Sequence, residues 1–194
     1  GHANPRGNTL FMAQYVVNIT NGSGSEKLPI GQYDVTAAVP GYNGALDPTT
    51  FTATGSEGTQ AFTISADGTL TPIVNETGAE GGTPVTAGTF IRCNSDGSET
   101  YGPAKTIDAT GNCVFDAVPY GTAESPISVY VKQLTSDKTH NVHTEVVAVS
   151  MVGQTQTQYV MNSPAALQTF TFTDKNYEGL DMTGTLTFDG PKAG

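Results

Sequence analysis

Hydrophobic and polar residues alternate along many short stretches of the chain. In the stretch 33–37, Tyr33, Val35 and Ala37 alternate with Asp34 and Thr36. Because successive side chains of a strand point to opposite faces of a sheet, this period of two predicts strands with one buried face. The same alternation predicts further strands at 51–54, 61–65, 90–93, 114–118, 129–134 and 146–151. No stretch combines an N-cap with an apolar period of 3.6 residues, so no helix is predicted.

Dipeptides that favour tight turns lie between the predicted strands. They are Asn21-Gly22, Asn43-Gly44, Asp67-Gly68, Asp96-Gly97 and Asp189-Gly190. Gly, Asn and Asp tolerate the positive φ angles that short hairpin loops require. Short strands joined by tight turns predict an all-β chain that folds as antiparallel β-sandwiches.

Two parts of this pattern occur twice along the chain. Residues 18–35 resemble residues 106–131, because each has a strand, a corner with proline and glycine, and a second strand. The corners are Leu28-Pro29-Ile30-Gly31 and Val118-Pro119-Tyr120-Gly121. Residues 70–91 similarly resemble residues 170–187. Leu70–Val74 matches Phe170–Thr173, and Ala87–Ile91 matches Thr183–Thr187.

These repeats divide the chain into three parts. The back half of one unit spans about 8–66, a complete unit spans about 68–166, and the front half of another spans about 168–190. A half sandwich exposes an apolar face and unpaired strand edges, which soluble proteins avoid. The outer halves therefore either pair with each other to complete a second sandwich or pack onto the central unit. We expect the first arrangement, which gives two units.

Composition excludes several classes of function. The 194 residues can bury a core without a metal or cofactor, so no cofactor is expected. A net charge of −10 with only eight basic residues argues against nucleic acid as a partner. Since no apolar run approaches the roughly 20 residues that cross a bilayer, direct membrane insertion is not expected.

The first corner and the residues after it resemble a known family signature. The segment from Leu28 to Thr36, followed by Val39-Pro40-Gly41-Tyr42, is similar to the "LPPGTYTVTE…PGY" signature of Cna-B and SpaA-type domains. Phe115 to Gly121, leading to Val129–Gln133, resembles the same signature. These domains are prealbumin-like, or more broadly Ig-like, sandwiches in the stalks of Gram-positive adhesins and pili.

The resemblance implies a location and a role. It implies an extracellular, cell-wall-associated module that acts as a stalk or spacer, is not an enzyme, and has neighbouring repeats of the same surface protein as partners. The alternative is a module that binds carbohydrate or a host protein, such as a glycan or matrix protein, because one fold serves many functions.

Many members of this family carry a Lys–Asn isopeptide bond promoted by a buried acid. Here the usual position of the acid holds Ala37 in the first repeat and Gln133 in the second. We expect Lys132 to face solvent, and the other lysines considered to lie in turns, loops or a terminus: Lys27, Lys105, Lys138 and Lys192. A crosslink is therefore not expected, unless a different acid takes this role.

Two cysteines and four tyrosines are candidate site residues. Cys93 and Cys113 flank the hairpin region at Asp96-Gly97, and a disulfide would form if their Cα atoms lie within about 7 Å. The alternative is that both are small buried hydrophobic residues. The tyrosines near predicted loops would form a binding surface or serve as structural corner residues; they are Tyr42, Tyr101, Tyr120 and Tyr177.

Catalytic chemistry has few candidate residues. Of the histidines, His2 is terminal, while His140 and His143 fall in the polar stretch 136–144, where exposed loop positions are expected. An enzymatic function would require His140 or His143 to meet a carboxylate in a cleft. The stretch 94–99 has a faint likeness to a calcium loop but is expected to be a hairpin turn. No metal site is predicted.

Overall fold

The computed structural model describes residues 13–190 and folds this range into nine β-strands without a helix. The strands are β1 (Gly31–Asp34), β2 (Thr50–Ala53), β3 (Gly68–Asn75), β4 (Gly88–Cys93), β5 (Thr100–Thr106), β6 (Phe115–Val118), β7 (Ile127–Ser136), β8 (Val147–Met151) and β9 (Thr155–Met161). The all-β prediction is confirmed. The predicted strand at 61–65 was wrong, since this stretch contributes only an isolated bridge between Thr63 and Asp47.

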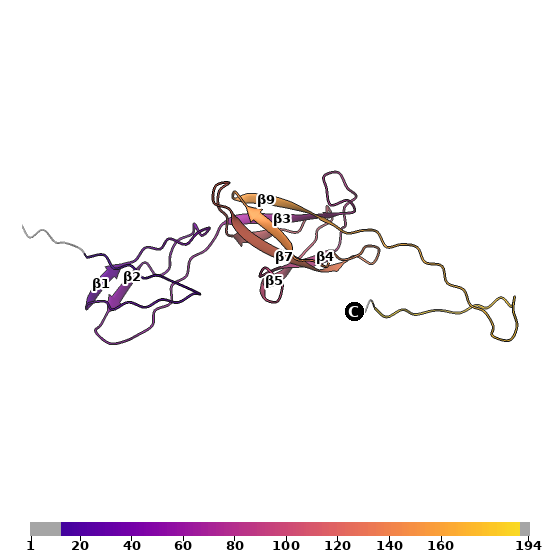
Figure 1. Ribbon diagram of the computed structural model, residues 1–194, viewed down its shortest axis with the longest axis horizontal. Coiled ribbons are helices and arrows are strands. Elements are labelled where there is room, and N and C mark those ends of the chain that lie inside the picture. The colour runs from indigo at the N-terminus through magenta and orange to yellow at the C-terminus, as the bar shows by residue number, and fades with distance from the viewer. Residues whose placement is uncertain (1–12, 191–194) are drawn as a thin grey trace, which may run out of the picture.

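A three-stranded and a four-stranded sheet form a sandwich in the middle of the chain (Figure 1). The larger sheet has the order β5-β4-β7-β8 and is antiparallel throughout. The smaller sheet has the order β6-β3-β9, in which β3 pairs antiparallel with β6 and parallel with β9. The predicted sandwich is confirmed, with one parallel pair that the sequence analysis did not anticipate.

The core lies between these two sheets and draws on the alternation seen in the sequence. Leu70 and Val74 of β3, Phe90 of β4, Val131 of β7 and Met151 of β8 are all fully buried. Buried and exposed positions alternate along β8, and buried residues recur at every second position of β7 from 129 to 133. Burial of apolar side chains makes the largest favourable contribution to the stability of such a unit.

Two residues that weaken most strands have a structural reason in β3. Pro72 cannot donate to a ladder, but its carbonyl accepts a hydrogen bond from Cys113 N at 2.9 Å, and the residue is fully buried. The dipeptide Asp67-Gly68 predicted a separate turn, but Gly68 instead begins β3. A side chain on Gly68 would collide with the carbonyl oxygen of Val118 on β6, so only glycine allows this approach.

The parallel pairing fixes where the chain enters and leaves the sandwich. Gly68 begins β3 at one end of the sandwich, which we call the leading end. Because β9 runs parallel to β3 and Met161 lies opposite Asn75, the chain leaves at the other end, which we call the trailing end. The eight residues of β3 span roughly 23 Å at about 3.3 Å per residue.

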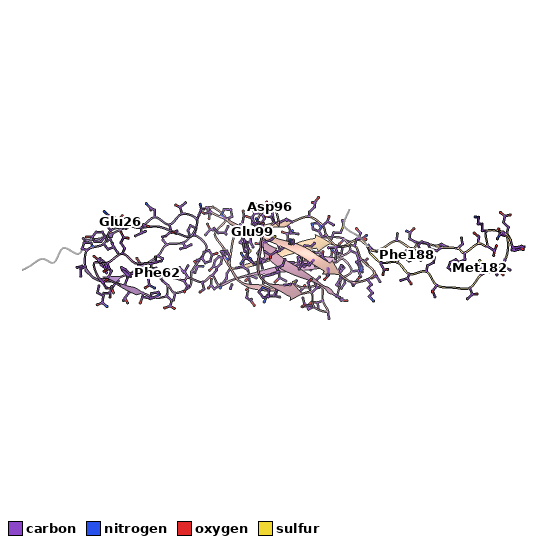
Figure 2. All side chains as sticks on the ribbon, turned by 90° about the horizontal axis from the view of Figure 1, so that it is seen from below. Glu26, Phe62, Asp96, Glu99, Met182 and Phe188 are labelled. Atoms are coloured by element: carbon purple, nitrogen blue, oxygen red, sulfur yellow. The ribbon has the colours of Figure 1, made fainter. Side chains whose placement is uncertain are left out.

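The segments before and after the sandwich bury few of their apolar residues. Residues 13–66 contain the antiparallel pair of β1 and β2, and residues 167–190 contain no strand. Figure 1 shows these segments on opposite sides of the sandwich, and Figure 2 shows Phe62 toward one end of the molecule and Met182 and Phe188 toward the other. Both segments therefore carry apolar side chains that face solvent.

Truncation of the central core residue tests this packing. We expect Phe90→Ala to lower the free energy of unfolding by about 3–5 kcal/mol, because it removes a fully buried aromatic ring. The control Leu134→Ala, at a side chain that is 44% exposed, should change it by less than about 1 kcal/mol. Urea denaturation would measure both, and equal losses would contradict the assigned core.

Candidate functional site

Three segments meet at the trailing end of the sandwich and form a polar junction. They are the turn after β3 (75–79), the loop after β7 (136–143) and the segment after β9 (162–165). Asn162 N donates to Asn75 O at 2.9 Å, so the ladder between β3 and β9 continues into the junction. We take this trailing-end junction as the candidate site because it sets how the following segment leaves the sandwich.

A pair of buried side-chain amides forms the centre of the junction. Gln133 Nε2 donates to Asn162 Oδ1 at 2.7 Å, and Asn162 Nδ2 donates to Gln133 Oε1 at 2.7 Å. Asn162 is fully buried and Gln133 nearly so. Ser136 Oγ donates to the same Asn162 oxygen at 2.7 Å, and His143 N donates to Gln133 Oε1 at 3.0 Å. The buried polar atoms are satisfied, which avoids the desolvation cost of an unpaired amide.

One member of this amide pair, Gln133, stands where the family resemblance places an acid. A neutral amide cannot act as the proton donor that the crosslinking reaction needs. The side-chain amide of Asn162 has hydrogen bonds with Gln133, Ser136 and the carbonyl of Met161, and none of these partners is an amine. The geometry is that of a hydrogen-bonded amide pair.

The lysines lie partly where they were expected. Lys132 is half-buried, and its Nζ donates to the carbonyl of Gly97 at 2.8 Å, so the prediction that it faces solvent was only partly right. Lys105 was expected in a loop but is an exposed residue of β5. Lys27 and Lys138 are in irregular or turn segments as predicted, and Lys192 lies outside the described residues.

The turn after β3 is held by one asparagine side chain. Asn75 Oδ1 accepts hydrogen bonds from Gly78 N at 2.7 Å and Thr77 N at 3.1 Å, while Asn75 Nδ2 donates to Ala79 O at 2.6 Å. Such asparagine-centred turns fix the backbone without regular secondary structure. The turn therefore holds Glu76 in place for its contact with the neighbouring loop.

His140 bridges the turn and the loop through two carboxylates. Its Nε2 lies 2.9 Å from Glu76 Oε1, and its Nδ1 lies 2.7 Å from Asp137 Oδ1. The histidine side chain is only 11% exposed, so the prediction of an exposed loop histidine was wrong. The hydrogen bond to Glu76, followed by that to Asp137, raises the pKa of His140 above its ordinary 6.5 and favours the charged imidazolium. The hydrogen bond from His140 lowers the pKa of Asp137.

An enzymatic function would require a histidine beside a carboxylate in a cleft, and this arrangement meets only part of that condition. His140 does meet carboxylates, but both of its ring nitrogens are bonded to them, so neither is free to take a proton from a nucleophile. The nearby shallow groove is lined by His143, Thr77 and Gly78 and not by His140. The contacts of His140 are therefore those of a salt-bridged junction.

Backbone hydrogen bonds extend the junction along the segment after β9. Asn141 N donates to Ser163 O at 2.9 Å, and Ala165 N donates to Thr139 O at 2.7 Å. Within the described range, the hydrogen bonds of residues 166–190 join residues of that same segment. The chain is thus anchored to the sandwich as far as Ala165.

The two cysteines are separate, buried thiols in the structure. Cys93 ends β4, where it pairs with Thr100 and Tyr130. Cys113 lies outside any strand and donates its backbone N–H to Pro72 of the other sheet. Burial raises the pKa of Cys93 and raises that of Cys113 to about 11, so both thiols are protonated at neutral pH. The alternative of small buried hydrophobic residues describes this arrangement, and the disulfide stays a prediction.

The four candidate tyrosines lie in different parts of the molecule. Tyr42 and Tyr120 are in two corners that meet at the leading end, where Tyr120 N donates to Gly41 O at 3.3 Å. Tyr120 also packs against the core, as a structural corner residue would. Tyr101 is exposed on β5, and Tyr177 is exposed in the segment after the sandwich. A shared binding surface stays a prediction that this placement does not favour.

Other predicted features can be located in the structure. The stretch 94–99 is a hairpin turn closed by Asn94 N and Glu99 O at 3.0 Å, as expected. Within residues 13–190, no cluster of three or more His, Cys, Asp or Glu side chains has the arrangement of a metal site. The same part of the chain has no helix that could span a membrane.

Comparison with known proteins gives remote likenesses of fold. No family model and no curated protein matches the chain. The Bacillus anthracis TIE protein is 14% identical over 55% of this chain and 18% of that protein, with a TM-score of 0.38. GBS52, the minor pilin of Streptococcus agalactiae, is 10% identical over 76% of this chain and 66% of that protein, with a TM-score of 0.44. The pilus 2b backbone protein of group B streptococcus is 12% identical over 66% of this chain and 53% of that protein, with a TM-score of 0.38.

The amide pair makes a testable contribution to stability. We expect Asn162→Ala to lower the free energy of unfolding by about 1–3 kcal/mol, because the buried Gln133 amide loses its partner. Adding Gln133→Ala should cost less than the sum of the two single changes, since the pair is already broken. Denaturation of the four proteins in this double-mutant cycle measures the coupling, and additive losses would contradict the pairing.

The His140 bridge predicts a pH dependence. Because the folded-state pKa is raised, the bridge stabilises the protein fully below about pH 6.5 and is lost as the pH rises through the raised value. Because the pKa of Asp137 is lowered, its contribution holds above its ordinary 3.8 and is lost as the pH falls through the lowered value. We expect His140→Gln to weaken the pH dependence of the midpoint of thermal unfolding between about pH 6 and pH 9. The control His143→Gln should keep the pH dependence of the wild type. An unchanged profile for the His140 variant would contradict the bridge.

Proposed function

We propose that the chain is a structural spacer of a bacterial cell-surface protein, with a central sandwich that carries tension along its length. The observation that carries this proposal is the parallel pairing of β3 with β9. A chain that enters at the leading end and leaves at the trailing end passes force through the sandwich. The first and last strands of the unit, which lie side by side, receive that force directly.

Tension on the flanking segments would load the ladder between β3 and β9 in shear. A pull at the leading end acts on the start of β3, and a pull at the trailing end acts on the end of β9. The two strands are then drawn past each other along their own axes, so all ladder hydrogen bonds resist together. A hairpin pulled at its open end would lose its bonds one at a time.

The limits of this ladder are set by two hydrogen bonds. Thr69 N donates to Gln154 O at 2.7 Å at the leading end, and Asn162 N donates to Asn75 O at 2.9 Å at the trailing end. Alternate residues of a parallel strand donate to the same neighbour. Counting back from Asn162, the donors of β9 toward β3 include Gln158, while the N–H of Thr157 points away from β3.

The trailing-end junction supports the same proposal. The amide pair, the Asn75 turn and the His140 bridge hold residues 162–165 against the sandwich. A spacer needs such a junction, because a freely hinged connection would not keep successive units in line. The proposed extracellular, cell-wall location and the neighbouring repeats as partners follow from the resemblance of the corner motifs.

Binding of a glycan or host protein is the less favoured function. It predicts aromatic side chains gathered on one surface, whereas Tyr42, Tyr101 and Tyr177 belong to three different segments. The proposal of a spacer therefore includes no ligand and no catalysis.

Proline substitutions in β9 test the mechanical role. We expect Gln158→Pro to lower the force that unfolds the sandwich when the full chain is stretched by its two ends, because it removes a ladder donor. The matched control Thr157→Pro should stay near the wild-type force, since β9 is an edge strand and this N–H faces away from β3. Single-molecule stretching measures the force, and circular dichroism checks that each variant is folded. Equal forces for the two folded variants would contradict the proposal.

A further inference from the structure

The sandwich has a groove on its side, between the edge strands β5 and β6. β5 is an outer strand of the larger sheet, and β6 is an outer strand of the smaller one. The groove has a volume of about 260 Å³ and is lined by residues of β4, β5 and β6. It lies apart from the trailing-end junction, since the two share no lining residue.

Both edge strands carry a bulge where they border this groove. Between residues 101 and 105, β5 advances four positions while its partner β4 advances two. β6 advances three positions while β3 advances two, and Ala117 in this bulge has a φ of +56°. Bulges re-aim side chains and interrupt the regular edge to which another strand could pair. The groove is therefore better suited to receive a side chain than an added strand.

Arg92 stands at a core-facing position of β4. It lies opposite the fully buried Val131 of β7, and Phe90, two positions earlier in β4, is also fully buried. Residues directly opposite each other in an antiparallel pair share a face, and so do residues two apart in one strand. The side chain of Arg92 therefore starts between the two sheets and reaches the groove that it lines.

The guanidinium of Arg92 has no partner among the described residues. Its Nε is buried and makes no hydrogen bond. Both ion pairs within residues 13–190 belong to His140. A buried donor on a charged group is costly to leave unpaired, so its position calls for an acceptor. A ligand that accepts hydrogen bonds from this side chain would remove the cost.

The lining of the groove indicates the chemistry of that ligand. Lys105 adds a second positive charge, in a chain whose net charge is −10. A carboxylate matches the planar fork of a guanidinium, because its two oxygens can accept two parallel N–H groups. Tyr101 and Pro103 add apolar surface beside these charges. The ligand that fits combines a carboxylate with a short apolar stem, as a glutamate side chain does.

We propose that this groove binds a glutamate side chain from an extended acidic segment of a partner protein. The carboxylate accepts hydrogen bonds from Arg92, Lys105 adds attraction, and the methylene groups pack against Tyr101 and Pro103. Sites for drug-sized ligands have volumes of roughly 300–1,000 Å³, so this smaller groove takes a single side chain. The site goes beyond the spacer role, which needs no ligand, and either can fail without the other.

Asp116 gives the proposal a second, opposite consequence. It lines the same groove, and its Oδ1 accepts a hydrogen bond from Thr69 Oγ1 at 3.4 Å. Because like charges repel, the carboxylate of Asp116 opposes a ligand carboxylate in the groove. Removal of this charge should therefore strengthen binding, an effect that a purely structural role of Asp116 would not produce.

Titration of the full chain with two capped pentapeptides tests the proposal. One peptide carries a single glutamate flanked by glycines, and the other carries glutamine at the same position. Amide chemical shifts in NMR spectra measure binding and locate it. The glutamate peptide should shift the signals of β5 and β6, with a dissociation constant on the order of millimolar, about tenfold below that of the glutamine peptide. Raising the ionic strength to about 0.5 M should weaken this binding.

Substitutions assign the binding to the groove. Arg92→Gln should weaken binding of the glutamate peptide about tenfold or more, because the carboxylate loses its charged donor. Asp116→Asn should strengthen it about twofold to fivefold, because an opposing charge is removed. The matched control Lys138→Gln removes one positive charge from an exposed turn and should keep the wild-type affinity. Circular dichroism checks folding, and Lys105→Gln, at an exposed position, decides the question if Arg92→Gln unfolds.

Each contrary result overturns the proposal. Equal binding of the two peptides would exclude recognition of a carboxylate. Glucuronate that binds more tightly than the glutamate peptide would assign the groove to an acidic sugar. Wild-type protein that self-associates in sedimentation, when Arg92→Gln does not, would assign it to a second copy of the chain. A folded Arg92→Gln or Lys105→Gln variant with wild-type affinity, or weaker binding by Asp116→Asn, would exclude the assigned contacts.

Discussion

The parallel pairing of β3 and β9 is the constraint on which the rest of the structure depends. It joins the first and last strands of the sandwich and makes β9 the third strand of the smaller sheet. It also places the exit of the chain at the end of the sandwich opposite to its entry. The trailing-end junction exists because β9 ends beside β3, which brings Asn162 next to Asn75. The separation of the two flanking segments follows from the same pairing.

Hydrogen bonds between neutral side chains hold the interior of the junction. Gln133 and Asn162 are two neutral amides that satisfy each other's hydrogen bonds in the buried site. A neutral pair has a smaller desolvation cost than a buried charge. His140, whose raised pKa favours the charged form, is less buried than the amide pair and lies between Glu76 and Asp137. The junction therefore separates a neutral interior from a charged rim.

Much of the fold could be predicted from the alternation of side chains, and the exceptions have physical causes. The strands β7 and β8 bury apolar residues at alternate positions and were found. The strands β4 and β6 were also found, although the two buried residues of each lie three positions apart. The strand β5 was missed because it is an exposed edge that contains Gly102 and Pro103. The strand β9 was also missed, because polar glutamines stand at its partly buried positions and hide the apolar alternation. The His140 bridge joins residues 64 apart in sequence, so no local pattern could reveal it. Gln133 was noted for its position, but its partner Asn162 could be found only from the fold.

The opposite placement of the two ends has an evolutionary consequence. A unit that is entered at one end and left at the other can be duplicated in a gene without changing the interior of any copy. The reach of such a molecule then depends on the number of copies, and each copy keeps the same mechanical properties. Selection could therefore adjust length and strength separately, the first by duplication and the second by substitutions in β3 and β9.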